Sequence, residues 1–229
     1  YELSTNIPGL FAIGECNFSD HGANRLGASA LMQGLADGYF VLPYTIQNYL
    51  SDQITVPRFS TDLPEFEQTE KAVNDRIAHL MGIKGKKSVD SIHKELGHVM
   101  WEYVGMARTK EGLQTALGKL KEIRKEFETN LFIPELQGVN IELDKALRLN
   151  DFITMGQLIA IDALNREESC GGHFREEHQT EEGEAKRDDK NCFYVSCWEY
   201  QGDDAKEPEL IKEPLEYEAI KVQTRNYKN

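Results

Sequence analysis

The sequence predicts a mainly α-helical protein: a short α/β segment, an antiparallel bundle of three to four helices, and a small C-terminal α+β segment with a short antiparallel sheet. Three observations predict this fold class. A short apolar run stopped by glycine lies near the start, apolar residues spaced by three and four fill the middle, and an alternating aromatic-rich stretch lies near the end. We expect the three parts to be residues 1–58, 59–169 and 170–229.

The first part has the outline of a nucleotide-binding unit. The apolar run Leu10–Ile13, stopped by Gly14, is typical of a buried strand. Small and apolar residues from Ala30 to Tyr49 then predict a helix, with a kink or a restart at Pro43.

The second part has helical periodicity throughout. We expect helices at about Pro64–Met81, Ser88–Val104, Thr109–Asn130 and Glu142–Glu168. Thr109 is placed to cap the third of these helices. The last helix is apolar on more than one face near its end, so we expect that end to be deeply packed. Short polar loops between the helices favour an antiparallel bundle.

The third part is acidic and contains strand-like segments. Residues Cys192–Tyr200 alternate as a strand does, and Gly202–Asp204 predicts a turn. Ile211 and the segment Ala219–Val222 are candidates for partner strands. The acidic loop Glu176–Lys190 indicates a solvated surface, with docking of a partner as the alternative.

Composition excludes several classes of function. The chain has 229 residues, is 40% hydrophobic and 28% charged, and so has the make-up of a globular domain. Its net charge of −13 argues against nucleic acid or an anionic membrane surface as the main partner. No apolar run approaches the roughly 18 residues of a membrane-spanning helix, so we expect no direct membrane insertion.

The cysteines and histidines predict no metal site. The four cysteines lack C-x-x-C and zinc spacing, which favours reduced thiols over a disulfide framework: Cys16, Cys170, Cys192 and Cys197. The histidines of the helical part (His79, His93 and His98) have no cysteine or acidic companions at ligand spacing.

The densest cluster of unusual residues is the loop from Gly14 to Leu31. Glu15, at the end of the expected strand, is placed to accept hydrogen bonds from ribose hydroxyls. The helix start at Ala28–Leu31 offers free N–H groups and a positive dipole end. Arg25 carries a charged fork that matches a carboxylate. The alternative is a glycine-rich structural turn with a surface arginine.

These residues carry a resemblance to a known family. Pro8–Cys16 followed by His21–Gly27 resembles the C-terminal FAD-binding signature of the succinate dehydrogenase/fumarate reductase flavoprotein subunit. Val104–Thr109, Ala163–Glu176 and Arg187–Asp189 resemble later segments of the same family, in the same order. The ten-residue step from Glu15 to Arg25 is similar to that of the Gram-positive and Bacteroides-type branch.

The resemblance implies roles for five residues. Glu15 would contact FAD, and Arg25 would bind a carboxylate of the substrate. Ala30 and Leu31 occupy the positions of a Ser-Leu pair that touches the flavin, where a backbone N–H contact survives the change to alanine. Ser29 replaces the usual asparagine and offers a hydroxyl one residue earlier.

Two further positions lie in the matched motifs without a settled role. Cys170 replaces the arginine of the family's "ESRG" element, so the salt bridge of that arginine is missing here. His21 would lie beside the flavin, where a structural hydrogen bond and a catalytic role are both open.

The family's activity is the interconversion of succinate and fumarate by hydride transfer with FAD. Electrons would pass to an iron–sulfur subunit, a membrane cytochrome b anchor subunit and quinone, with the flavoprotein peripheral on the cytoplasmic side of the inner membrane. The family's dinucleotide fingerprint, FAD-attaching histidine and proton-transferring arginine have no counterparts in this sequence. We therefore expect a C-terminal fragment that has no catalytic residue of its own, does not retain FAD and is inactive alone.

Two alternatives stay open. L-Aspartate oxidase shares the His21–Arg25 loop, although Leu26–Ala28 favours the succinate/fumarate branch. A non-catalytic helical assembly module is the other alternative, favoured by the departures at Ala30 and Cys170.

Overall fold

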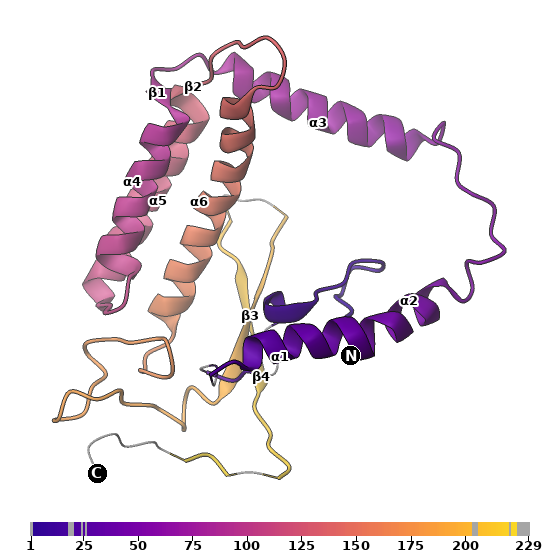
Figure 1. The fold of residues 1–229 in the computed structure, drawn as a ribbon. Coiled ribbons are helices and arrows are strands. Elements are labelled where there is room, and N and C mark those ends of the chain that lie inside the picture. Colours follow the sequence, from indigo (N-terminus) through magenta and orange to yellow (C-terminus); the bar gives the residue numbers. More distant parts are fainter. Residues whose placement is uncertain are drawn as a thin grey trace. The chain divides into compact units, whose positions relative to one another are not determined.

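The computed structural model describes residues 2–17, 21–23, 25, 27–202, 206–219 and 221–223. The chain divides into two compact units (Figure 1). The first consists of Tyr1–His79 with Cys170–Gly172, and the second of Leu80–Ser169 with His173–Asn229. The boundaries expected at residues 58 and 170 stay a prediction.

The first unit is built around one long helical run. After the 3-10 helix η1 (Gly14–Cys16), α1 (Ser29–Ala36) passes through the π-helical turn η3 (Asp37–Val41) into α2 (Leu42–Leu50). The π turn lies just before Pro43, whose ring lacks an N–H and crowds the carbonyl four residues earlier. The sequence predicts a kink or a restart of the helix at Pro43, and the structure has the π-helical turn η3 just before this residue. The helix α3 (Pro64–Gly82) follows, as predicted.

The strand predicted at Leu10–Ile13 is wrong. Phe11 makes only an isolated bridge with Ser4, while Leu10 and Ile13 are 51% and 39% exposed. A strand needs at least one neighbouring strand to pair with its backbone N–H and C=O groups. In the described part of the first unit no named strand lies beside this segment. The run instead forms the returning arm of a short loop, in which Thr5 N–H donates to the Leu10 carbonyl and Ala12 N–H donates to the Leu3 carbonyl.

The second unit contains a bundle of three helices. Figure 1 shows α4 (Val89–Val104), α5 (Lys110–Asn130) and α6 (Ile141–Asn165) side by side, with consecutive helices antiparallel. Their contact faces form one buried core, whose fully enclosed members include Ile92, Leu113, Leu120, Leu149 and Ile153. This apolar stripe is the one that the three-and-four spacing predicts.

Side-chain caps fix where these helices begin. Thr109 Oγ1 accepts a hydrogen bond from the N–H of Gly112 at 3.0 Å, which confirms the predicted cap of α5. Ser88 and Asn140 cap α4 and α6 in the same way. The two-residue strands β1 (Lys87–Ser88) and β2 (Leu131–Phe132) pair in parallel and join the start of α4 to the end of α5.

The end of α6 packs through small residues. Gly156, Ala160 and Ala163 are buried against the other helices, whereas Ile159 is 41% exposed. The expectation of deep packing therefore holds for one face only. Small side chains let the helices approach closely there, and the larger apolar residues lie on the outer side.

The C-terminal part forms a two-stranded sheet. β3 (Tyr194–Glu199) pairs antiparallel with β4 (Glu209–Pro214), and Cys197 lies opposite Ile211. This confirms the predicted strand and its partner at Ile211. Ala219 and residues 221–222 form no strand, and the predicted turn residues Asp203 and Asp204 lie outside the described residues.

Two other features bear on function. No disulfide joins the four cysteines, all of which lie within the described residues. Among the described residues, no helix is both long and apolar enough to span a bilayer.

Candidate functional site

The loop between η1 and α1 presents the predicted ligand-binding side chains to solvent. Glu15 lies exposed in η1, and Arg25 is exposed with its guanidinium donating to the Gly27 carbonyl. Leu31, in the first turn of α1, is 76% exposed. Residues 18–20, Asn24 and Leu26 of the matched loop lie outside the described residues.

Two buried polar side chains hold η1 against the helical run. Asp37, 7% exposed, accepts a hydrogen bond from the N–H of Gly14 at 2.9 Å through Oδ2. Gln33, also 7% exposed, donates through Nε2 to the Asn17 carbonyl at 2.8 Å. Together they fix both ends of η1 and hence the position of Glu15.

Sequence analysis missed this pair of anchors. Gln33 and Asp37 are four residues apart, so they lie on one face of the helical run. Their neighbours are mostly small or apolar, and a polar residue repeated at helical spacing in such a context is a signal of buried hydrogen bonding.

The N-terminus of α1 has unsatisfied polar groups. Ala28 is its N-cap residue and supplies no side-chain cap, so N–H groups of the first turn have no side-chain acceptor at that position. Ser29 Oγ is buried without a hydrogen-bond partner among the described residues, and so is Gln33 Oε1. A bound ligand with a polar edge would satisfy such groups, because buried polar atoms are seldom left unpaired.

Ala30 and Leu31 lie in the same first turn. Ala30 is half-buried and Leu31 exposed, so this turn presents an apolar edge beside its backbone N–H groups. The arrangement brings Ser29, Ala30 and Leu31 together at one helix end. It can hold a flat ligand that has both ring atoms and hydrogen-bond acceptors.

The segment Cys170–Gly172 belongs to the first unit and lies against the loop. Gly171 has φ +60°, and a Cβ atom at this position would overlap the carbonyl group of Ala23 and lie 3.0 Å from the Ala23 side chain. The backbones of the two matched motifs, His21–Gly27 and Ala163–Glu176, are therefore in direct contact at Ala23 and Gly171. Cys170, in the position of the family's arginine, is half-buried in this segment.

In the second unit, the later motif residues form a buried polar network around Arg175. This arginine is 1% exposed, donates to the carbonyls of Ala163 and Leu164 at 3.0 and 3.3 Å, and pairs with Glu177 at 3.1 Å. Ser169 Oγ accepts from the Arg175 N–H at 2.8 Å and donates to its carbonyl at 3.1 Å.

Arg166 ties the end of α6 to β3. It pairs with Glu168 at 2.9 Å, donates to the carbonyls of Cys192 and Tyr194, and lies over the Tyr194 ring. Glu168, 4% exposed, also accepts from the N–H of Asp188 at 2.9 Å. The matched Arg187–Asp189 segment is therefore fastened to the network.

His173 completes the network as a neutral side chain. Burial lowers its pKa below the ordinary value, and the charges of Arg108 and Arg175 act in the same direction, against a smaller opposing effect of the bond to Arg166. Nδ1 accepts from Arg108 at 2.9 Å and Nε2 donates to the Arg166 carbonyl at 2.9 Å. With its polar groups satisfied, this cluster orders the chain rather than binding a ligand.

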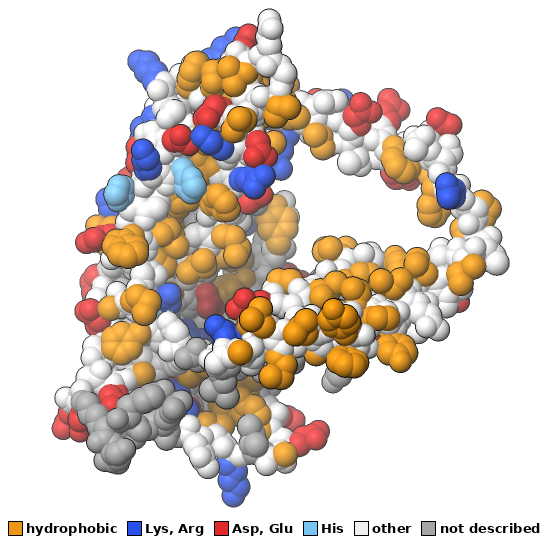
Figure 2. Space-filling model, in the orientation of Figure 1, with side chains coloured by type: hydrophobic (Ala, Val, Ile, Leu, Met, Phe, Trp, Pro, Cys, Tyr) orange, Lys and Arg blue, Asp and Glu red, His pale blue; other side chains and the backbone are white. Residues whose placement is uncertain are grey.

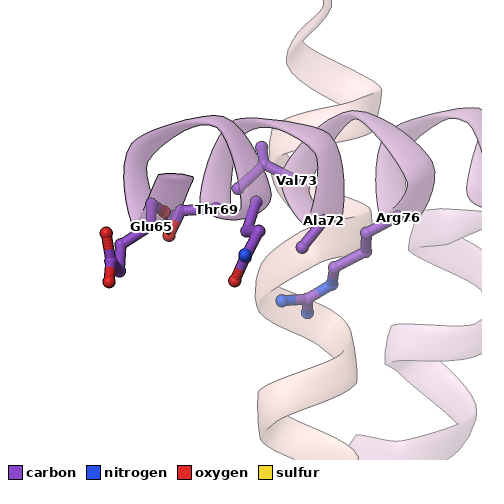
Figure 3. Close-up of a pocket in the computed structure, with 6 residues that line it drawn as sticks. Glu65, Thr69, Ala72, Val73 and Arg76 are labelled. Carbon is purple, nitrogen blue, oxygen red and sulfur yellow. Dashed lines mark hydrogen bonds between the residues drawn. The ribbon is translucent and has the colours of Figure 1, made fainter. Parts of the chain in front are cut away.

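Of two surface hollows among the described residues, one lies away from both clusters and the other borders the buried polar network at Asp188, Cys192 and Tyr194. Side chains along one helix, α3, line an open groove, as the labelled residues from Glu65 to Arg76 show (Figure 3). The groove has a volume of about 520 Å³, and no second element contributes to its lining. A second hollow of about 620 Å³ has mixed charge and is lined by residues such as Glu167, Lys186, Asp188 and Lys212. Within the described ranges, no three metal-ligating side chains converge.

Comparison with known proteins identifies a matching family model. The model described as "Fumarate reductase flavoprotein C-term" matches residues 93–227. This match begins within α4 and covers the rest of that helix, α5, α6, the buried polar network and the two-stranded sheet.

Individual relatives extend the match toward the N-terminus. The chain is 29% identical to the succinate dehydrogenase flavoprotein subunit of Bacillus subtilis, over 78% of this chain and 30% of that protein. It is 31% identical to the fumarate reductase flavoprotein subunit of Serratia sp., over 96% of this chain and 34% of that protein. The chain thus spans about a third of the length of the relatives it matches.

A solved structure shows the same fold. A mutant of the E. coli quinol fumarate reductase subunit FrdA superimposes with a TM-score of 0.78 at 25% identity, over 97% of this chain and 36% of that one. The mainly helical architecture with its short antiparallel sheet is therefore that of known flavoprotein C-terminal regions.

Proposed function

The chain belongs to the succinate dehydrogenase/fumarate reductase flavoprotein family, and we propose that it is the C-terminal part of a subunit that interconverts succinate and fumarate. The main observation behind this proposal concerns the first turn of α1. There the buried hydroxyl of Ser29 has no hydrogen-bond partner among the described residues, and the exposed Arg25 lies shortly before it in sequence. These are the groups needed to hold a flavin and an anionic substrate side by side.

The residues present fit FAD. Ser29 Oγ, the N–H groups of Ala30 and Leu31, and the positive end of α1 would bind the polar edge of the flavin ring, where they favour negative charge. Glu15, held in place through Gly14 and Asp37, would accept hydrogen bonds from the ribose. When bound, FAD supplies the hydride chemistry that no side chain of this chain provides.

Arg25 would bind the substrate. Its guanidinium would present a planar fork of N–H donors to one carboxylate of the dicarboxylate. Fixing that carboxylate orients the central carbons of the substrate, which lowers the entropic cost of reaching the reactive geometry. Arg25 therefore binds and orients, and the proton is moved by a group outside this chain.

The exposed apolar face of the helical run supports the proposal that this chain holds only part of the FAD site. Figure 2 shows apolar side chains along the helical run α1–η3–α2. Five residues of this run are each more than 60% exposed: Leu31, Met32, Tyr39, Phe40 and Tyr44. An apolar face of this size is normally covered. We propose that the remainder of the FAD-binding domain covers it, and that the chain alone neither retains FAD nor turns over substrate.

The partners follow from the same proposal. Electrons would leave the intact flavoprotein through an iron–sulfur subunit to a membrane cytochrome b anchor and quinone. The protein would lie on the cytoplasmic side of the inner membrane, bound through these subunits. We also propose that the boundaries between the three parts of the chain lie at residues 58 and 170.

Dye-coupled turnover by the intact FAD-loaded parent protein tests this function. We expect turnover of succinate or fumarate, and Arg25→Ala should lower kcat/KM by about 100-fold or more because the charged bidentate contact is lost. Arg25→Lys keeps the positive charge but lacks the planar fork, so its kcat/KM should lie between those of the wild type and Arg25→Ala. FAD content should be equal in all three proteins.

The other outcomes decide between the alternatives. Turnover of L-aspartate alone would assign the chain to the oxidase branch. If the parent protein binds no flavin, the result would support the alternative of a non-catalytic assembly module. Equal kcat/KM for the wild type and Arg25→Ala would contradict the role of Arg25.

A further inference from the structure

We propose that Gly171 is a positioning residue for the substrate arginine. The absence of a side chain at position 171 lets the backbone of Ala23 lie directly against Cys170–Gly172, and this contact sets where Arg25, two residues later, presents its guanidinium. The inference rests on the proposed function of Arg25 and adds a residue from the distant Ala163–Glu176 motif to the same site.

The geometry at Gly171 leaves no room for any other residue. Its φ of +60° lies in the left-handed region, which L side chains rarely adopt. A Cβ atom would in addition overlap the carbonyl of Ala23, which is backbone and cannot rotate away as a flexible side chain could. A methyl group would therefore have to displace one of the two segments by about 1 Å, since carbon atoms pack at roughly 3.5–4.0 Å.

The loop before Arg25 is the segment expected to move. The residues that flank Cys170–Gly172 in sequence are held by buried hydrogen bonds, Ser169 to Arg175 and His173 to the Arg166 carbonyl. In the loop, by contrast, Arg25 is exposed and its guanidinium donates to the carbonyl of nearby Gly27. A displacement of about 1 Å at a substrate-orienting group is enough to cost up to 100-fold in rate.

The chain offers two matched controls. A Cβ atom at Gly172 meets nothing within 4 Å, so Gly172→Ala adds the same methyl group one residue later without an overlap. Gly138 has φ +84° and also meets nothing within 4 Å, so Gly138→Ala introduces the backbone strain without the contact. Only Gly171 combines strain with an overlap on the Arg25 loop among these three positions.

The test uses the intact FAD-loaded protein and two readouts. We expect Gly171→Ala to raise KM for succinate, and Kd for malonate, by at least tenfold at unchanged FAD content, while Gly172→Ala and Gly138→Ala change them by less than twofold. Malonate is a dicarboxylate that cannot be dehydrogenated, so its Kd reports binding alone. Hydrogen exchange in peptides covering residues 21–25 should also be faster in Gly171→Ala only.

A measurement on the wild type covers the case in which Gly171→Ala does not fold. Malonate should slow hydrogen exchange in peptides containing residues 21–25 and 170–172, and should leave the peptide around Gly138 unchanged. Protection of 21–25 without 170–172 would overturn the inference.

The result separates this inference from the proposed function. If the wild type turns over succinate but Gly171→Ala matches Gly172→Ala in KM and exchange, the inference is overturned and the function stands. If the wild type turns over neither succinate nor fumarate and does not bind malonate, the proposed function fails and the role assigned to Gly171 fails with it.

Discussion

At the scale of single residues, buried polar groups decide how the chain is ordered. Arg175 and Ser169 have almost no contact with solvent, yet Nε, Nη1 and the backbone N–H of Arg175 bond to a carboxylate, to two carbonyls and to a hydroxyl. Such groups contribute little net stability when paired but are costly when a partner is removed.

Removing Arg175 should therefore destabilise the second unit strongly. We expect Arg175→Met to lower the free energy of unfolding by about 3 kcal/mol, because two buried carbonyls lose their donor and Glu177 loses its pair. Urea unfolding followed by circular dichroism measures it. Arg148→Ala, which removes an exposed pair with Asp144, should change the value by less than about 0.5 kcal/mol.

His173 should make stability depend on pH. Because burial lowers its pKa in the folded state, the unfolded chain binds the proton more readily. Its contribution is then fully present above the unfolded pKa of about 6.5 and is lost as pH falls from there toward the lowered folded pKa. Unfolding measured between pH 5 and 8 should show this loss, and His173→Gln should reduce it.

At the scale of elements, helix starts could be read from the sequence with good accuracy. Thr109 was recognisable as a cap because its hydroxyl precedes an apolar stripe by the right interval, and the structure confirms the bond to Gly112. The strand at Leu10–Ile13 could not be tested by pattern alone, since an apolar run forms a strand only where neighbours exist to pair with it.

The cap gives an element-scale prediction. Thr109→Ala should lower the free energy of unfolding by about 1 kcal/mol, because the N–H of Gly112 loses its acceptor. Thr115→Ala makes the same chemical change in the middle of α5, where the hydroxyl bonds only to the Glu111 carbonyl of its own helix. That variant should be as stable as the wild type or slightly more so. Thermal and urea unfolding of both variants compare the two positions; equal losses would contradict the capping role.

At the scale of the whole molecule, the order of the motifs predicted the family, whereas composition did not. The charge argued against nucleic acid as the main partner and the apolar content predicted no membrane span, but both fitted many globular folds. The motif order from Pro8 to Asp189 predicted the family. It could not reveal that Gln33 and Asp37 hold η1, nor that Gly171 meets Ala23, because both depend on which backbones approach one another in three dimensions.

The contact between Gly171 and Ala23 also bears on the order of folding. The three helices of the bundle follow one another directly, so their contacts close short loops and should form early. Gly171 and Ala23 are about 150 residues apart in sequence, and bringing them together requires the closure of a long loop. During refolding of the intact protein, helical signal should therefore return before substrate binding, and the Arg25 loop should be among the last parts to reach its final position.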